Sequence, residues 1–198
     1  MNNFVDNIQF PPMKVPADKY CVRDNICYGR RRVGIYTDKM YYAVEACGEV
    51  VSPWFEELII CPSFNVCKKK DVYFLTSPYG NEIISAPYRA IGTFRAVHGL
   101  GRTFAKVRTL DRKYGTISSE GKVGIACTQD TLELFGAACA VCGKMSEDGM
   151  RYGIFAVNGE KIVDYKFASY KISKCKLIMI MSSGECWKYS KLGIRLKA

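Results

Sequence analysis

The stretch "RYGIFAVNGEKIVDYKF", residues 151–167, indicates how this chain folds. Apolar and polar residues alternate on both sides of Asn158-Gly159, as they do along strands that bury one face. Asn followed by Gly suits the two positive-φ positions of a type I′ turn, which joins paired antiparallel strands tightly. The stretch therefore predicts a β-hairpin with a two-residue turn at 158–159.

Short runs rich in Tyr, Val, Ile and Phe recur along the rest of the chain and are separated by turn residues. Two more hairpins are predicted, with turns at 37–39 and 77–81, because Asp, Asn, Gly and Pro gather there. The last apolar run, 175–182, is apolar nearly throughout and is expected to be a central strand. Single strands are also predicted at 92–99, 103–110 and 122–128.

Two stretches favour helices instead. Ser52 is a suitable N-cap for a short helix over 52–60. A second helix is predicted over 129–144, capped by Asp130 and ended by Gly143.

The expected fold class is mainly β, an antiparallel barrel or sandwich of the chymotrypsin-like type with one or two short helices. The chain has 198 residues, of which 48% are hydrophobic, and this is enough to bury one substantial core. Neither a linker nor a shift in composition marks a boundary. Residues 1–198 are therefore expected to form a single domain.

The formal net charge is +10, from 29 Lys and Arg against 19 Asp and Glu. Such an excess favours anionic partners, such as nucleotides or nucleic acid. No apolar run is long enough to cross a bilayer, and the first residues lack a signal-peptide pattern. A cytoplasmic protein without membrane contact is expected, with its ten cysteines reduced.

The residues suited to catalysis are few. His98 is the single histidine, so any histidine-dependent mechanism has to use it. The segment "AVCGK", 140–144, has the outline of a chymotrypsin-like cysteine protease nucleophile, but His98 is too near in sequence to be its base. The pair Cys139 and Cys142 is the one CxxC motif, whereas a structural zinc site normally needs a second pair. No metal or cofactor is expected.

An ordered set of motifs resembles the poxins, viral and insect proteins that cleave the cyclic dinucleotide 2′3′-cGAMP and share a chymotrypsin-like protease ancestry. The segment "IQFPP" resembles the family's His-x-Phe-Pro-Gly element. Other matching segments follow in the same order along the chain: "VGIYTDK" (33–39), "SPYGNEIISAPYR" (77–89), "FRAVHGLGR" (94–102), "GKVGIA" (121–126) and "AVNGEKIVDYKF" (156–167).

The resemblance implies metal-free attack of a 2′-hydroxyl on the neighbouring 3′–5′ phosphodiester, with a His, a Tyr and a Lys in the catalytic roles. These three positions fall on Ile8, Asp130 and Leu134, and none of them can do the original chemistry. We therefore expect neither an active nuclease nor an active protease. On the same resemblance, Lys166 and Lys122 are the residues expected to bind an anionic ligand such as a cyclic dinucleotide.

The function implied by the resemblance is that of a poxin-like viral protein, related to nucleases that block cGAS-STING immunity, in the cytoplasm of an infected host cell. It would bind its ligand without cleaving it. A viral structural or assembly protein that forms a lattice, capsid or homo-oligomer is an alternative. Thirteen tyrosines and ten cysteines, which titrate at alkaline pH, would suit an assembly that dissolves in base. A further alternative is an RNA-binding module, in which exposed aromatic rings stack on bases.

Overall fold

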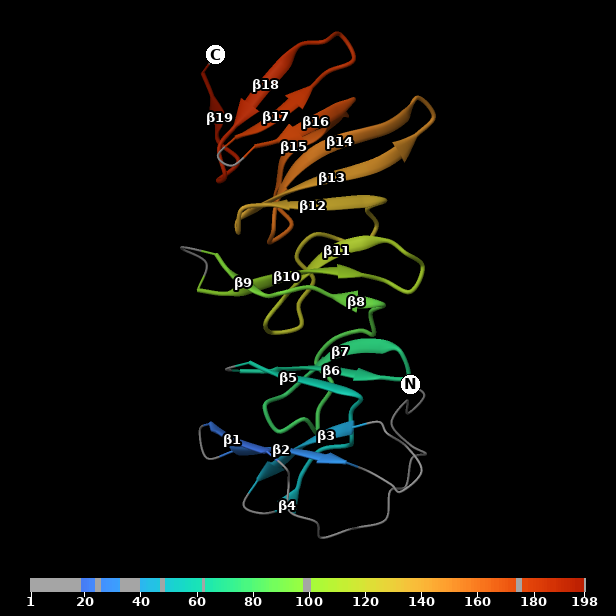
Figure 1. Ribbon diagram of the computed structural model, residues 1–198. Helices are drawn as coiled ribbons and strands as arrows, with labels where there is room; N and C mark the ends of the chain where they lie inside the picture. Colours follow the sequence, from blue (N-terminus) through green and yellow to red (C-terminus); the bar gives the residue numbers. More distant parts are fainter. Residues whose placement is uncertain are drawn as a thin grey trace. The chain divides into compact units, whose positions relative to one another are not determined.

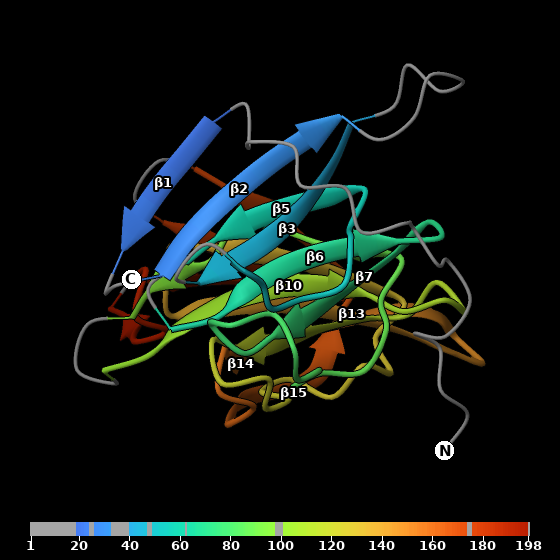
Figure 2. The same cartoon turned by 90° about the horizontal axis from the view of Figure 1, so that it is seen from below.

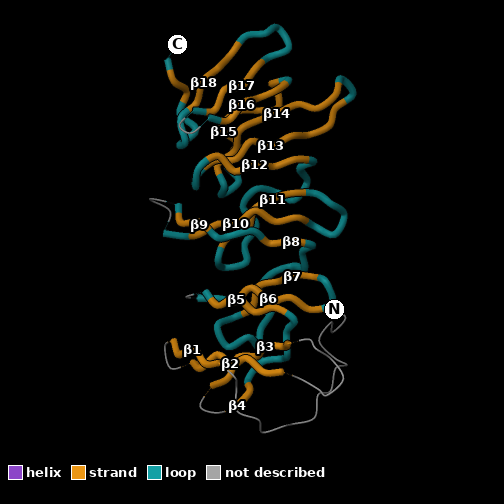
Figure 3. Tube along the Cα trace, viewed as in Figure 1, coloured by secondary structure: helices purple, strands orange, loops and turns teal. Residues whose placement is uncertain are grey.

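All regular structure in the described part of the chain is β-strand, and every strand pairing there is antiparallel. The computed structural model describes residues 19–23, 26–32, 40–46, 49–61, 63–97, 101–173 and 176–197. Figures 1 and 3 show strands joined by turns and loops throughout these ranges. The mainly β, antiparallel fold class is confirmed. The described sheets are open, and none of them closes on itself.

The chain divides into two compact units, Met1–Ala86 and Pro87–Ala198. The first unit holds a four-stranded and a three-stranded sheet, each built from consecutive strands. Strands β1, β2 and β3 lie side by side in Figure 2. The strands of this unit are β1 (Lys19–Arg23), β2 (Ile26–Arg32), β3 (Met40–Ala46) and β4 (Glu49–Val50), then β5 (Glu57–Ile60), β6 (Asn65–Lys69) and β7 (Val72–Thr76).

The second unit holds three four-stranded sheets. Strands β8 and β9 both pair with β10 at different residues, so together they form one interrupted edge strand. The first sheet contains β8 (Ala90–Ile91), β9 (Arg95–Ala96), β10 (Thr103–Arg108) and β11 (Tyr114–Ser118). The second contains β12 (Thr131–Phe135), β13 (Cys139–Ser146), β14 (Gly149–Ala156) and β15 (Lys161–Phe167). The third contains β16 (Ser169–Ile172), β17 (Leu177–Ile180), β18 (Cys186–Tyr189) and β19 (Arg195–Leu196).

The sheet β12–β15 is covered on both faces. Val141 of β13 packs in one cluster with Phe167 and Leu177, which includes residues of the third sheet. Its neighbour Cys142 points the other way and packs in a cluster with Ile125 and Tyr114. A strand buried on both faces has no polar positions along most of its length.

Both helix predictions are wrong, and this two-sided burial explains the longer one. Residues 129–144 contain β12 and most of β13. All of β12 pairs with the first five residues of β13, and the chain turns at Gly136, where φ is +72°. A continuous short apolar run does not distinguish a buried strand from a buried helix by its periodicity. In the other stretch, 52–60, the last residues form β5 and pair with β6. In both places cross-strand hydrogen bonding prevails over the local capping signals.

The hairpin at 151–167 is confirmed as β14 and β15, but its predicted type I′ turn is wrong. Gly159 has φ +98°, whereas Asn158 is not among the residues with positive φ. The Gly159 N–H donates to Ala156 O at 2.9 Å, and the Ala156 N–H donates to Glu160 O at 2.8 Å. These bonds define a three-residue loop whose last residue is left-handed. The longer loop allows Val157 to be buried, at 1% exposure.

Two of the other predicted strands are confirmed, and one is wrong. Strand β10 lies within 103–110 as predicted, and β17 lies between β16 and β18, which confirms a central strand at 175–182. Residues 122–128 form no strand and contribute only the isolated bridge between Val123 and Ile117. The predicted turn at 37–39 lies outside the described residues.

A buried threonine joins the first two sheets of the second unit. The Thr116 hydroxyl on β11 donates to Val157 O at 2.6 Å and accepts the Ile125 N–H at 2.7 Å. Thr116 has no exposed surface. Gly124 makes this approach possible, because a Cβ there would lie 2.2 Å from Val157 O.

Replacing Thr116 by Val is expected to destabilise the protein by between about 2 and 5 kcal/mol, since it leaves a buried N–H and a buried carbonyl without partners. The control variant Thr116→Ser keeps the hydroxyl and loses one buried methyl group, which costs about 1 kcal/mol. Urea unfolding measures both changes. Equal stability of the Val variant and the native chain would show that the hydroxyl does not link the sheets.

Candidate functional site

Basic side chains gather around one tryptophan in the second unit. The Lys166 Nζ lies 3.8 Å from the ring centroid of Trp187, and the Arg195 Cζ lies 3.6 Å from the same centroid. Lys188 follows the tryptophan on β18, and Lys197 follows the last residue of β19. We call these five residues the Trp187 cluster.

The Trp187 cluster borders a hollow of about 410 Å³. The lining of the hollow consists of Cys186, Trp187, Lys188, Arg195, Leu196 and Lys197. Among the described residues, none of the four cations of the cluster forms an ion pair. The carboxylate of Glu185 accepts the Trp187 Nε1–H at 2.5 Å. The hollow is therefore strongly cationic.

Local strand geometry brings these charges together. Strands β18 and β19 pair Tyr189 with Arg195, which places the arginine beside the tryptophan two residues earlier on β18. The tryptophan is held by the core, because its ring meets the Phe167 ring edge-on at 5.6 Å. Lys166 precedes that phenylalanine on β15. Cations packed against an indole face are attracted by its quadrupole and keep their N–H donors free for an anion.

The two residues predicted to bind an anionic ligand, Lys166 and Lys122, lie in different places. Lys166 belongs to the Trp187 cluster. Lys122 lies in another place, where it forms an ion pair with Glu120 at 3.4 Å, and no described contact joins it to the cluster. Ile8 and His98 lie outside the described residues.

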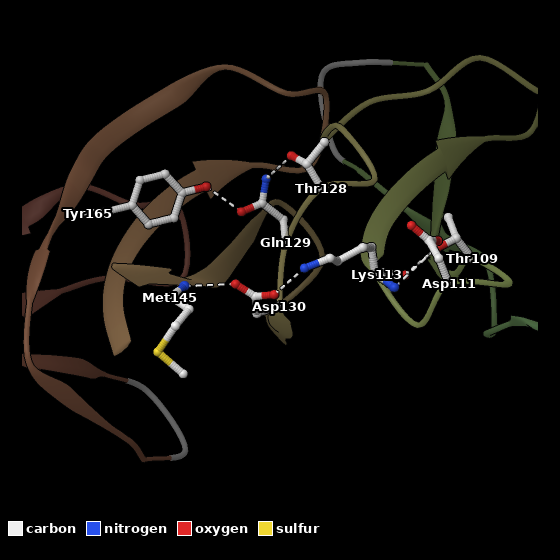
Figure 4. A network of polar contacts seen from close by, with 8 residues as sticks. All are labelled: Thr109, Asp111, Lys113, Thr128, Gln129, Asp130, Met145 and Tyr165. Atoms are coloured by element: carbon white, nitrogen blue, oxygen red, sulfur yellow. Dashed lines mark hydrogen bonds and ion pairs between the residues drawn. The ribbon is translucent and has the colours of Figure 1, made fainter. Parts of the chain in front are cut away.

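Asp130 is part of a polar network between β11 and β13, shown in Figure 4. Its Oδ1 accepts a hydrogen bond from Lys113 Nζ at 2.5 Å, and its Oδ2 accepts the Met145 N–H at 2.7 Å. These two bonds, that from Lys113 first, lower the pKa of Asp130 below its ordinary value. An ionised carboxylate in this setting cannot donate a proton to a leaving oxygen.

The neighbours of Asp130 are also engaged in structural contacts. Gln129 is buried and accepts a hydrogen bond from the Tyr165 hydroxyl, and its amide donates to Thr128 Oγ1 at 3.3 Å (Figure 4). Burial raises the pKa of Tyr165 to about 12. Leu134, at the other inferred catalytic position, packs against two apolar clusters. No described contact joins Asp130 or Leu134 to Lys166.

The cysteine chemistry considered from the sequence is not supported by the geometry. Cys139 and Cys142 are both buried on β13, and residues three apart on a strand point to opposite faces. Burial raises the pKa of Cys139 to about 11 and that of Cys142 to about 12, which disfavours the thiolate that a nucleophile needs. Within the described ranges, no three His, Cys, Asp or Glu side chains are grouped to hold a metal ion.

Sequence reasoning missed Trp187 and Arg195, which complete the site. The sequence "CWKYSKLGIR", residues 186–195, alternates aromatic and basic residues before a glycine turn and has Arg195 after it. This alternation could have indicated a hairpin with cations beside rings. The contact with Lys166 could not have been found in this way, since β15 is distant in sequence.

Comparisons with known proteins give no family for this chain. No protein-family model matches it, and no curated protein matches it. Among solved structures, it is similar to the computationally designed Ika8 protein, with a TM-score of 0.32 and 11% identity. The match covers 93% of this chain, which spans 62% of the designed one. The described residues contain no helix that is long and apolar enough to cross a membrane.

The Asp130 network predicts a pH-dependent stability difference. Because the pKa of Asp130 is lowered in the folded protein, its contribution is present above the unfolded value of about 3.9 and is lost as the pH falls through the folded pKa. Asp130→Asn is therefore expected to destabilise the protein at pH 7, and the difference from the native chain is expected to shrink below pH 4.

Thermal unfolding at several pH values measures this difference. Asp148→Asn is the matched control, since Asp148 lies in the β13–β14 turn and makes no described hydrogen bond or ion pair. A constant effect of Asp130→Asn from pH 7 to pH 3 would contradict the assignment of the ion pair.

Proposed function

We propose that this protein binds a phosphate-bearing nucleotide at the Trp187 cluster and does not cleave it. The observation that carries the proposal is a hollow lined by three cations, Lys188, Arg195 and Lys197, with Lys166 packed on the ring of Trp187. None of these four cations forms an ion pair with a carboxylate among the described residues. Lys and Arg side chains recognise phosphate through charge-assisted hydrogen bonds, and Arg does so with two donors at once. The positive net charge of the whole chain adds attraction at longer range.

The resemblance to poxins makes a cyclic dinucleotide the ligand of choice. Its two phosphodiesters carry two negative charges on a compact ring, which suits a hollow bordered by several separate cations. Lys166 lies in the segment that resembles the family's phosphate-facing strand, and it contacts the tryptophan that organises the other charges. On this proposal the chain sequesters 2′3′-cGAMP in the cytoplasm of an infected cell.

Absence of cleavage is proposed from the residues at the inferred catalytic positions. Asp130 is held as a carboxylate by Lys113 and by a backbone N–H, and Leu134 has no exchangeable proton. Cleavage by the 2′-hydroxyl needs a base, an acid and a cation for the phosphorane charge. The Trp187 cluster supplies cations alone.

Isothermal titration with 2′3′-cGAMP in EDTA tests binding, and chromatography of the same mixture tests cleavage. We expect saturable binding that weakens with salt, and no linear product. Lys166→Ala and Arg195→Ala should each weaken binding about tenfold, because losing one charge-assisted contact costs on the order of 1.4 kcal/mol.

The control variant is Lys161→Ala, on the same strand as Lys166. Lys161 pairs with Asp164 at 2.9 Å, so its loss should leave the affinity unchanged. Rapid formation of a linear product would overturn the non-cleaving proposal. If an unstructured RNA binds through Lys166 and Arg195 while 2′3′-cGAMP does not, the RNA-binding alternative replaces it. Association of the unliganded chain into large particles would favour the assembly alternative.

A further inference from the structure

A second hollow in the same unit holds a lysine in an unusual setting. The hollow has a volume of about 320 Å³, within the range of small-molecule sites, and is separate from the Trp187 cluster. It is lined by side chains from all three sheets of this unit: Lys106, Tyr114, Asp130, Thr131, Leu132, Glu133 and Tyr170.

Lys106 is half-buried and has no carboxylate partner. Its Nζ donates to Leu132 O and lies 4.5 Å from the ring centroid of Tyr114. No ion pair of Lys106 occurs in the described ranges. The guanidinium of Arg108, two residues along β10, lies 5.7 Å from the same ring.

Burial makes the neutral amine of Lys106 easier to form than that of an exposed lysine. Desolvation by burial, and then the positive charge of Arg108, lower the pKa of Lys106, although Glu133 acts in the opposite direction. By contrast, ion pairs with carboxylates raise the pKa of Lys68 and of Lys113. A neutral amine is the form of lysine that attacks electrophiles.

The other titratable groups that face the hollow are largely engaged. Tyr170 donates its hydroxyl hydrogen bond to Glu133 Oε2 at 2.8 Å, and burial raises the pKa of Tyr170. Asp130 forms an ion pair with Lys113. Cys142 of β13 is buried, and its raised pKa keeps it protonated. The hollow therefore offers one amine that has no ion pair among the described residues, beside a hydrogen-bonded hydroxyl and carboxylate.

We propose that Lys106 is a carbonyl-binding residue, which forms an imine with a small aldehyde that enters this hollow. The neutral amine adds to the carbonyl carbon, so a C–N bond forms while the C–O π electrons move to oxygen. A proton then passes from nitrogen to that oxygen. Protonation of the resulting hydroxyl, loss of water and loss of a proton from nitrogen give the C=N bond. Tyr170 and Glu133 line the same hollow, and on this proposal they exchange these protons with solvent.

Reductive trapping tests this proposal on the full chain. The probe is pyridoxal with sodium cyanoborohydride at pH 7, whose hydride converts any imine to a stable secondary amine. Peptide mapping by mass spectrometry then gives the labelling rate at each lysine. We expect Lys106 to be labelled several-fold faster than Lys122 and Lys144, with a rate that saturates as pyridoxal increases. Exposed lysines should show a linear dependence.

Two variants separate a built site from general reactivity. Tyr170→Phe should slow labelling at Lys106 alone, whereas Tyr152→Phe should leave it unchanged, since Tyr152 contacts the Tyr170 ring at 4.9 Å but does not line the hollow. Lys106→Arg should remove the saturable component while the circular dichroism spectrum is preserved. The proposal is overturned if labelling at Lys106 is linear in pyridoxal and no faster than at Lys122.

Discussion

One buried hydrogen-bonding group, the hydroxyl of Thr116, connects two sheets of the second unit where no strand pairing joins them. Strand β11 and the loop of the β14–β15 hairpin are not neighbours in any sheet, so no backbone ladder connects them. The threonine gives one hydrogen bond to Val157 O and takes one from the Ile125 N–H, which satisfies two groups that are shielded from water. Gly124 has no side chain and leaves room for this contact.

The packing of the sheets determines which residues line the two hollows. Because β12–β15 packs against a sheet on each face, its side chains contribute to one hollow through β12 and to the basic cluster through β15. Lys106 meets Glu133 and Tyr170 only because three sheets come together, and Lys166 meets Trp187 only because two do. The side chains of both hollows therefore lie where sheets adjoin, on strands that are paired within those sheets.

Much of the local structure could be predicted from the sequence, because strand alternation and turn residues act over a few positions. The hairpin at 151–167 and the central strand at 175–182 follow from such patterns. The helix predicted over 129–144 failed for a physical reason: burial on both faces removes the alternation that identifies a strand. The two-residue turn predicted at 158–159 is a three-residue loop, in which Val157 is buried.

The sequence by itself determined the class of fold and the excess of positive charge. These properties depend on residue type or on neighbours a few positions apart. The tertiary structure alone decided that Lys166, rather than Lys122, has unpaired cations beside it, and that Asp130 is tied to Lys113. Contacts between strands distant in sequence depend on register and sheet packing, and neither is encoded in a short stretch of chain.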